Sequence, residues 1–168
     1  LSSSSAASDV YKRQSAERVP EAVAIIYHGT EITYAALQAR VIRLAGSLQE
    51  RAGVRRGDRV VLYMQNSPQF IIAFHAILRA NAVAVPVNPM NRLREMEHVV
   101  ADSGARVAIV GQELLDHIAP LIGRPLAHVL AAAYADMADP TCDIPLPSGL
   151  EAGERDDYCL LYTSPSPR

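Results

Sequence analysis

The chain alternates short apolar runs with segments whose apolar residues recur every three or four positions. The runs at 22–27, 59–64, 82–85, 106–110 and 158–163 are rich in β-branched or large apolar residues and predict strands. Between them, a period near 3.6 predicts helices of about 10–18 residues. Strands that alternate with helices of this length are typical of βαβ crossovers. The pattern therefore predicts an α/β fold, a mainly parallel sheet with flanking helices.

The first part of the pattern predicts a β-hairpin followed by an amphipathic helix. The strand at 22–27 is followed by a turn at His28–Thr30 and a return strand at 31–33. Thr33 is suited to cap the helix, because its hydroxyl can accept an otherwise unpaired backbone N–H. We expect the helix to end near Gly53. Its predicted buried residues are Leu37, Val41, Leu44 and Leu48.

The middle of the chain predicts a strand and a helix that are both buried. Residues 59–64 are a nearly continuous apolar run, which is typical of a strand covered on both faces. Ser67 as N-cap and Pro68 at the first helical position predict where the next helix begins. Because this helix is apolar almost all round, we expect it to be deeply buried and to end at Asn81.

Predictions for the second half continue the alternation. Proline content excludes residues 86–91 from a central strand or a helix. Gly104 is expected to cap the helix that precedes it. In order, we predict a helix at Arg92–Ser103, a strand at Arg106–Val110, a helix at Gln112–Leu121, a strand at Ala127–Leu130, a long surface connection at 131–157 and a final strand at Tyr158–Thr163.

Composition and charge exclude several classes of protein. The chain has 18 acidic and 16 basic side chains, so it lacks the basic surface on which nucleic-acid binding relies. Its apolar runs are far shorter than the ~20 residues of a transmembrane helix, and no basic segment precedes an apolar one as in a secretory signal. Its two cysteines, Cys142 and Cys159, cannot form a disulfide framework or a four-ligand zinc site. We expect a cytoplasmic protein.

The two ends differ in composition from the body. Five of the twelve serines and the only lysine, Lys12, lie in the first 14 residues. Both residues 1–14 and the Ser-Pro-rich residues 165–168 are similar to translated adapter sequence, and we expect them to be artefactual or disordered. A natural disordered tail and a natural terminus are the alternative. Residues 15–164 are expected to form one partial domain.

No catalytic constellation emerges from residue spacing alone. The five histidines do not lie in a cluster with metal-ligand spacing. We expect His75, on a buried helix, to be a hydrogen-bonded core residue. His98 could form an acid–histidine array with Glu95 and Asp102, but a solvated helix face explains the same spacing. Dinucleotide-binding, P-loop and nucleophile-elbow motifs are missing as well. The sequence therefore predicts no catalytic and no metal residue.

Several ordered motifs resemble one family. Residues 32–37 (ITYAAL), 57–61 (GDRVV), 66–70 (NSPQF), 77–89 (ILRANAVAVPVNP) and 102–105 (DSGA) are similar to motifs of AMP-forming acyl-adenylating enzymes. The motif sequences VPVNP and DSGA are most similar to those of bacterial fatty-acyl-CoA ligases. Where the family usually has glycine, this chain has Asn81, which tolerates the left-handed backbone of a helix end.

The resemblance implies an incomplete N-terminal part of the large domain of an adenylate-forming enzyme. Such an enzyme couples a carboxylate, here a fatty acid, with ATP and transfers the acyl group to CoA, with Mg²⁺ assisting. Thr163 and Ser164 match the start of the family's phosphate-binding loop and are implied nucleotide-binding residues. Pro165 and Pro167 then remove two backbone donors, and no glycine or lysine follows. We expect the chain itself to be inactive and to bind none of these cofactors.

Two other functions remain open at this point. The chain could be a standalone α/β module that binds a small molecule or a nucleotide, or an interaction domain without chemistry. If it is part of a larger domain, an edge strand and apolar surface should be exposed. We therefore also expect self-association of the isolated chain.

Overall fold

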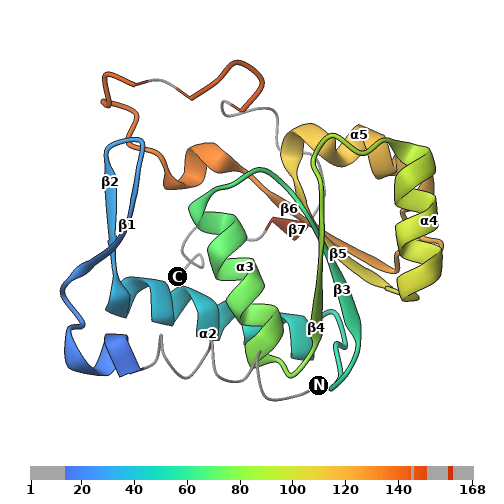
Figure 1. The fold of residues 1–168 in the computed structure, drawn as a ribbon, viewed down its shortest axis with the longest axis horizontal. Helices are drawn as coiled ribbons and strands as arrows, with labels where there is room; N and C mark the ends of the chain where they lie inside the picture. The colour runs from blue at the N-terminus through green and yellow to red at the C-terminus, as the bar shows by residue number, and fades with distance from the viewer. Residues whose placement is uncertain (1–13, 145, 151–158, 161–168) are drawn as a thin grey trace, which may run out of the picture.

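The computed structural model describes residues 14–144, 146–150 and 159–160. It has a five-stranded parallel sheet with helices on both faces, and a separate two-stranded hairpin (Figure 1). The predicted α/β class is confirmed. Residues 1–13 of the predicted terminal segment 1–14, and all of the predicted segment 165–168, lie outside the described residues.

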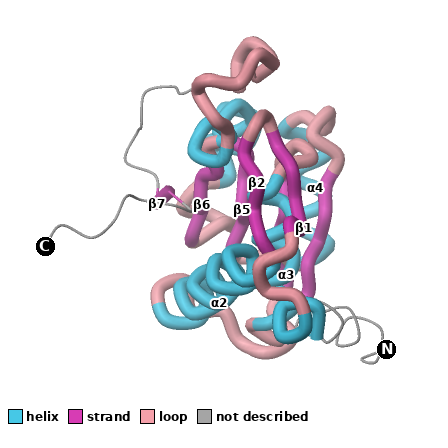
Figure 2. The backbone as a smooth tube through the Cα atoms, turned by 90° about the vertical axis from the view of Figure 1, so that its left-hand side faces the viewer, coloured by secondary structure: helices cyan, strands magenta, loops and turns pink. Residues whose placement is uncertain are grey.

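The hairpin consists of β1 (Val23–Tyr27) and β2 (Thr30–Thr33), which pair antiparallel as predicted. Its two-residue turn holds His28 at φ 40° and Gly29 at φ 78°, the positive values that such a tight turn needs. A register shift lies between Val23 and Ile25. Figure 1 shows the hairpin to the left of the larger sheet, and Figure 2, seen from that side, shows it in front of the larger sheet.

Helix α2 (Tyr34–Glu50) follows directly from β2. The Thr33 hydroxyl caps it by accepting the Ala36 N–H at 3.2 Å, which confirms the predicted N-cap. The helix ends three residues before Gly53, and its four predicted inward residues are all buried. These are Leu37, Val41, Leu44 and Leu48.

The main sheet has the order β4-β3-β5-β6-β7, with every pair parallel. From β3 the chain first crosses to β4 on one side and then returns to β5 on the other. Right-handed crossovers in opposite directions lie on opposite faces, so helices cover both sides. The strands are β3 (Arg59–Tyr63), β4 (Val83–Val87), β5 (Val107–Gly111), β6 (His128–Ala132) and β7 (Cys159–Leu160).

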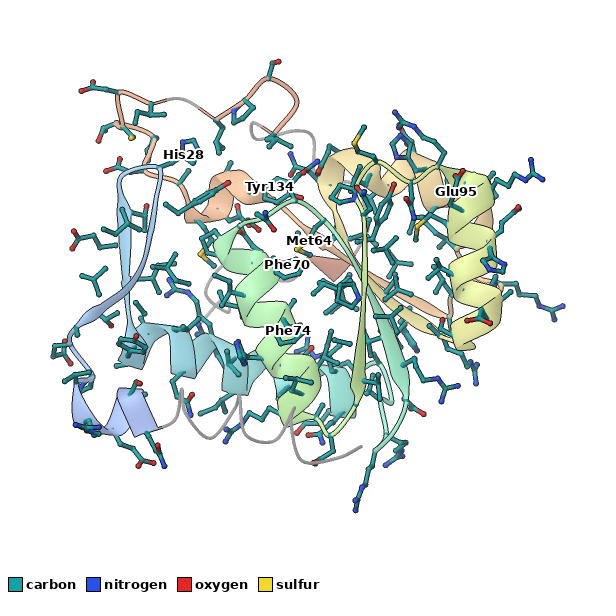
Figure 3. The ribbon with its side chains drawn as sticks, in the orientation of Figure 1. His28, Met64, Phe70, Phe74, Glu95 and Tyr134 are labelled. Carbon is teal, nitrogen blue, oxygen red and sulfur yellow. The ribbon has the colours of Figure 1, made fainter. Side chains whose placement is uncertain are left out.

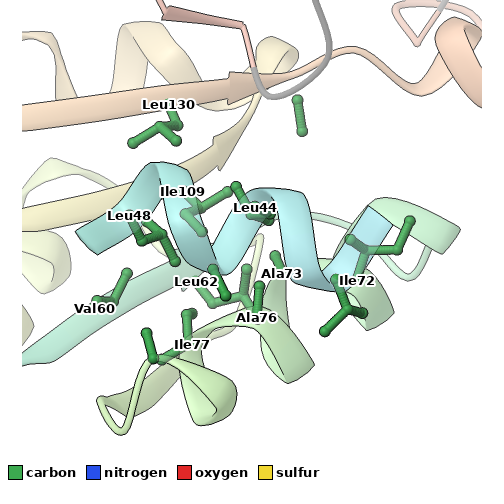
Figure 4. Close-up of a cluster of buried hydrophobic side chains, with 14 of the residues drawn as sticks. Leu44, Leu48, Val60, Leu62, Ile72, Ala73, Ala76, Ile77, Ile109 and Leu130 are labelled. Atoms are coloured by element: carbon green, nitrogen blue, oxygen red, sulfur yellow. The ribbon is translucent and has the colours of Figure 1, made fainter. Parts of the chain in front are cut away.

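Two apolar clusters bury the two faces of this sheet. Helices α2 and α3 (Pro68–Arg79) cover the face that carries Val60 and Leu62, as Figure 4 shows. On the opposite face, α4 (Leu93–Ser103) and the short α5 (Leu115–Ile118) cover Val61 and Tyr63. Residues 60–63 are all fully buried, which confirms the continuous run as a strand covered on both sides.

Cap predictions for α3 and α4 are confirmed. The Ser67 hydroxyl accepts the Phe70 N–H at 3.2 Å, with Pro68 in the first turn. Asn81, just after α3, has φ 59°, and Gly104 caps α4 at φ 64°. The expected full burial of α3 is wrong on one side, because its outward residues are only half-buried. These are Phe70, Ile71, Phe74 and Leu78, with the two phenyl rings parallel to within 7° (Figure 3).

Three further predictions need correction. Strand β4 continues beyond the predicted 82–85 through Pro86 and Val87. It is an edge strand of the described sheet, where a proline is tolerated, so the exclusion of residues 86–91 from a central strand still holds. Residues 112–121 form three short helical pieces and not one helix. They are η1 (Gln112–Leu114), α5 and η2 (Ala119–Leu121). Pro120 accounts for the end of α5 at Ile118, because a proline cannot continue an α-helix.

Residues 131–137 are not a surface connection. Ala131 and Ala132 complete β6, which is longer than predicted at this end, and η3 (Tyr134–Met137) follows. Tyr134 is fully buried and Met137 nearly so. The alanine-rich sequence did not indicate that the end of β6 and Tyr134 belong to one buried apolar cluster. Of the predicted final strand, Cys159 and Leu160 are described, and they pair parallel with β6.

Candidate functional site at the carboxyl edge of the sheet

The strand order gives the sheet a switch point between β3 and β5. The connection after β3 runs to one side and the connection after β5 runs to the other, so their first residues diverge at the carboxyl edge. Open parallel sheets bind ligands outside the carboxyl ends of their strands at such a point. Polar side chains from the ends of β3, β5 and β6 meet there.

Tyr134 is the centre of this polar group. Its ring is fully buried, and Figure 3 shows it at the carboxyl end of the sheet. The hydroxyl accepts the backbone N–H of Gln65 at 2.9 Å and donates to Oε1 of Glu113 at 3.0 Å. Gln65 follows β3, Glu113 follows β5 and Tyr134 follows β6. One hydroxyl thus joins the ends of three strands.

Gly111, the last residue of β5, makes this arrangement possible. A Cβ atom at this position would collide with the Tyr134 hydroxyl and lie 2.6 Å from Oε2 of Glu113. Only a residue without a side chain lets the tyrosine and the carboxyl approach the strand so closely. The glycine is required here by close approach and not by its backbone angle.

Glu113 is a half-buried carboxyl group. Burial raises its pKa, and the Tyr134 hydroxyl and the nearby Gln65 side chain oppose that shift. Its Oε2 is buried without a hydrogen-bond partner among the described residues. Burial also raises the pKa of Tyr134 far above its usual value, and the negative charge of Glu113 raises it further. Tyr27 on the hairpin is affected in the same way, since burial and then Glu113 raise its pKa.

Gln69 holds the backbone next to Tyr134. It is fully buried in the first turn of α3, and its Nε2 donates to the carbonyl oxygen of Ala133 at 2.7 Å. A longer contact of 3.4 Å reaches the carbonyl of Tyr134. The amide therefore attaches the end of β6 to the helix that follows β3.

A second polar group lies on the opposite face of the sheet, around Tyr63. Its hydroxyl lies 2.5 Å from the carbonyl oxygen of Asn91 and 3.0 Å from Nδ1 of His117. Arg92 contacts Nε2 of the same ring. The tyrosine donates to Asn91, and the His117 ring contacts both Tyr63 and Arg92.

The structure bears in different ways on the residues that the sequence analysis singled out. Thr163 and Ser164 lie outside the described residues. His75 is buried and meets the Phe74 ring edge-on at 5.4 Å. Glu95 accepts the Arg92 backbone N–H at 3.0 Å, while His98 is exposed, so the solvated-face interpretation of that helix fits. In the described ranges, no group of three or more His, Cys, Asp or Glu could hold a metal ion.

Sequence reasoning missed the residues that meet at this edge. The sequence pattern predicts Tyr134 in a surface connection. It predicts Glu113 inside a helix, where nothing distinguishes it from the other acidic residues. A signal was available at residues 111–113, where glycine directly follows an apolar strand and precedes an acid. Nothing in the sequence pairs that acid with a tyrosine 21 residues later.

A family profile described as AMP-binding enzyme matches residues 12–166. Feruloyl-CoA synthase of Amycolatopsis sp is 41% identical over 148 residues, which are 88% of this chain and 28% of that protein. A long-chain-fatty-acid–CoA ligase of Escherichia coli O6:H1 is 32% identical over 124 residues, 73% of this chain and 22% of the ligase. The chain thus spans about a quarter of the length of these relatives.

The fold is also similar to solved structures. A crystal structure of an anthranilate CoA ligase in complex with anthranoyl-AMP matches with a TM-score of 0.73 and 23% identity. The match covers 91% of this chain and 26% of the ligase. At that identity the likeness supports the architecture alone. No helix among the residues placed by the structure is long and apolar enough to cross a membrane.

Proposed function

Because this chain belongs to the AMP-binding enzyme family, we propose that it forms part of an ATP-dependent ligase that joins a carboxylic acid to CoA. In the proposed reaction the carboxylate attacks the α-phosphorus of ATP, which forms an acyl-adenylate and releases pyrophosphate. The CoA thiol then attacks the acyl carbon, and AMP leaves. We place the reaction in the cytoplasm, in line with the sequence expectation.

The observation that carries this proposal is the parallel pairing of β7 with β6. It supports a nucleotide site at the carboxyl edge, where β7 runs in the same direction as β3, β5 and β6. We propose that the hydroxyls of Thr163 and Ser164, shortly after β7, donate to phosphate oxygens of ATP. Pro165 and Pro167 offer no N–H, so we propose that the 168-residue chain is inactive alone.

Magnesium belongs to the proposal only through the family. No acidic cluster that fits a divalent cation occurs in the described part of the chain, so no step is assigned to a metal here. The role proposed for this part of the enzyme is to hold the strand ends rigidly where ATP binds.

For the acid we propose a fatty acid, because the motifs at 85–89 and 102–105 are most similar to those of bacterial fatty-acyl-CoA ligases. The main competitor is an aromatic acid, because the relative with 41% identity is named a feruloyl-CoA synthase. The two candidates differ in shape, so a direct comparison of dodecanoate with ferulate separates them.

The experiment replaces the matched 148 residues of the Amycolatopsis enzyme with the corresponding residues of this chain. Pyrophosphate release and acyl-CoA formation are then measured with ATP, Mg²⁺, CoA and either acid. We expect an active hybrid and no turnover by the 168-residue chain. A folded but inactive hybrid would contradict the ligase proposal. A thermal shift of the isolated chain with ATP would favour a standalone nucleotide-binding module instead.

A further inference from the structure

We infer that Tyr134 and Gln69 are positioning residues, which set the carboxyl end of β6 and thereby the place where β7 ends. The inference rests on the proposed function, because β7 leads to the residues proposed to bind ATP. Neither side chain is assigned contact with ATP or the acid. They act through backbone: Tyr134 on the strand ends, and Gln69 on the Ala133 carbonyl.

The position of β7 depends on β6. Among the described strands, β7 pairs only with β6, through Leu130 opposite Cys159 and Ala131 opposite Leu160. A two-residue strand makes few ladder hydrogen bonds of its own. Any displacement at the end of β6 is therefore passed directly to β7.

The end of β6 is fixed by side chains more than by a helix. Strand β5 leads into helical turns of ten residues in three pieces, whereas β6 leads only into the four-residue η3. Residues 133–134 are instead held from three directions. The Gln65 N–H and the Glu113 carboxyl bind the Tyr134 hydroxyl, and the Gln69 amide binds the Ala133 carbonyl.

The contacts also explain why a tyrosine is needed. Its hydroxyl accepts and donates at the same time, so one oxygen atom pairs both with the backbone N–H of Gln65 after β3 and with the carboxyl of Glu113 after β5. Phenylalanine would fill the same buried volume and satisfy neither group. A Tyr134→Phe variant therefore separates the hydrogen bonds from the packing of the ring.

Hydrogen exchange on the full 168-residue chain tests the inference. For Tyr134→Phe and for Gln69→Met, which keeps the side-chain length, we expect roughly tenfold faster exchange of amides in 130–134 and 159–160. Amides of β4 and of the facing part of β3 should be unchanged. The matched control is Tyr63→Phe, which removes the hydroxyl of the other fully buried tyrosine, because the hydrogen-bond partners of that hydroxyl, Pro89, Asn91 and His117, all lie outside β6.

Two exchange results would overturn the inference. One is equal acceleration in every strand, which a general loss of stability produces. The other is an unprotected β7 in the unaltered chain, which would mean that β6 does not hold it.

Kinetics of the hybrid enzyme separate this inference from the proposed function. In an active hybrid we expect Tyr134→Phe to raise the KM for ATP at least fivefold and to change kcat less than twofold. An active hybrid with an unchanged KM would overturn the positioning role alone. A folded hybrid without activity would overturn the ligase proposal, and the exchange measurement would still decide whether β6 holds β7.

Discussion

The two sheets of this protein are built in opposite ways. The central strands of the five-stranded sheet are buried on both faces, and the four residues 60–63 expose no surface. The hairpin buries one face only. Its inner residue Ile32 is 1% exposed, whereas Ile26 is 72% exposed and Val23 is 42% exposed.

A register shift accounts for the outward apolar residues of the hairpin. Val23 and Ile26 are three positions apart, which would place them on opposite faces of a regular strand. The irregularity between Val23 and Ile25 turns both outward. Two more exposed apolar residues, Val19 and Ile144, belong to the segments that adjoin the hairpin, and His28 contacts the Ile144 carbonyl at 2.9 Å. Stability is therefore concentrated in the parallel sheet, whereas the hairpin leaves apolar side chains exposed to solvent.

The largest expected effect is a core truncation in the parallel sheet. Leu62→Ala should lower the free energy of unfolding by about 2–5 kcal/mol, because the side chain is completely buried between the sheet and its helices. Urea denaturation measures the loss. The control is Ile26→Ala on the hairpin, for which we expect less than about 0.5 kcal/mol. Equal losses at the two positions would contradict the comparison.

The next effect concerns the close approach at Gly111. Gly111→Ala should cost about 1–3 kcal/mol, since the new methyl group meets the Tyr134 hydroxyl and the Glu113 carboxyl. In a Tyr134→Phe background the added cost should be smaller, because one of the two obstacles is gone. A double-mutant cycle by urea denaturation measures this coupling. Strictly additive losses would show that the hydroxyl and the methyl group do not meet.

A pH-dependent difference should follow from Glu113. Folding raises the pKa of this carboxyl, so the folded state favours its protonated form. The stabilisation of the folded state by the protonated carboxyl is fully present below the unfolded pKa of about 4.3. It is lost as the pH rises through the folded pKa. Relative to Glu113→Gln, the unaltered protein should therefore lose stability as the pH rises from 4 to 8. Urea denaturation of both proteins at each pH measures this difference.

Glu95 provides a control of opposite sign. Backbone hydrogen bonds lower its pKa, so its contribution is present above the unfolded pKa and is lost as the pH falls through the folded pKa. Relative to Glu95→Gln, the unaltered protein should gain stability as the pH rises from the folded pKa to the unfolded pKa of about 4.3, and should change little above it. If both comparisons changed in the same direction, the proposed environment of Glu113 would be wrong.

The smallest effect on stability, and a clear one on association, is expected at the hairpin. We propose that the isolated chain self-associates through the outward apolar residues of the hairpin, and that Ile26→Lys reduces this association. The change in unfolding free energy should stay within about 0.5 kcal/mol, because Ile26 contributes little to the core. Light scattering coupled to gel filtration, over a range of concentrations, measures the mass. Ile42→Lys on α2, which is 45% exposed, is the matched control. Persistent association of Ile26→Lys would locate the contact elsewhere.

Much of the fold was predictable because local signals agreed with the tertiary structure. The apolar run at 59–64, the Ser67-Pro68 helix start and the left-handed Asn81 each have one dominant local cause. Pro86 was harder, since its tolerance depends on β4 being an edge strand, and strand order is not a local property.

The polar group at the carboxyl edge could not be predicted for a related reason. Gln65, Glu113 and Tyr134 lie 48 and 21 positions apart along the chain, and each is unremarkable in its own segment. They meet only because β3, β5 and β6 are adjacent and parallel. The order of the strands, and not the pattern within any one of them, creates the group.

The same order has a consequence for synthesis. After β3 and β4 have paired, β5, β6 and β7 each join the exposed side of the strand that precedes them in the growing sheet. A nascent chain can then extend the sheet in one direction as it leaves the ribosome, without reopening a pair already made. From β5 onward, each newly emerged strand serves as the template for its successor.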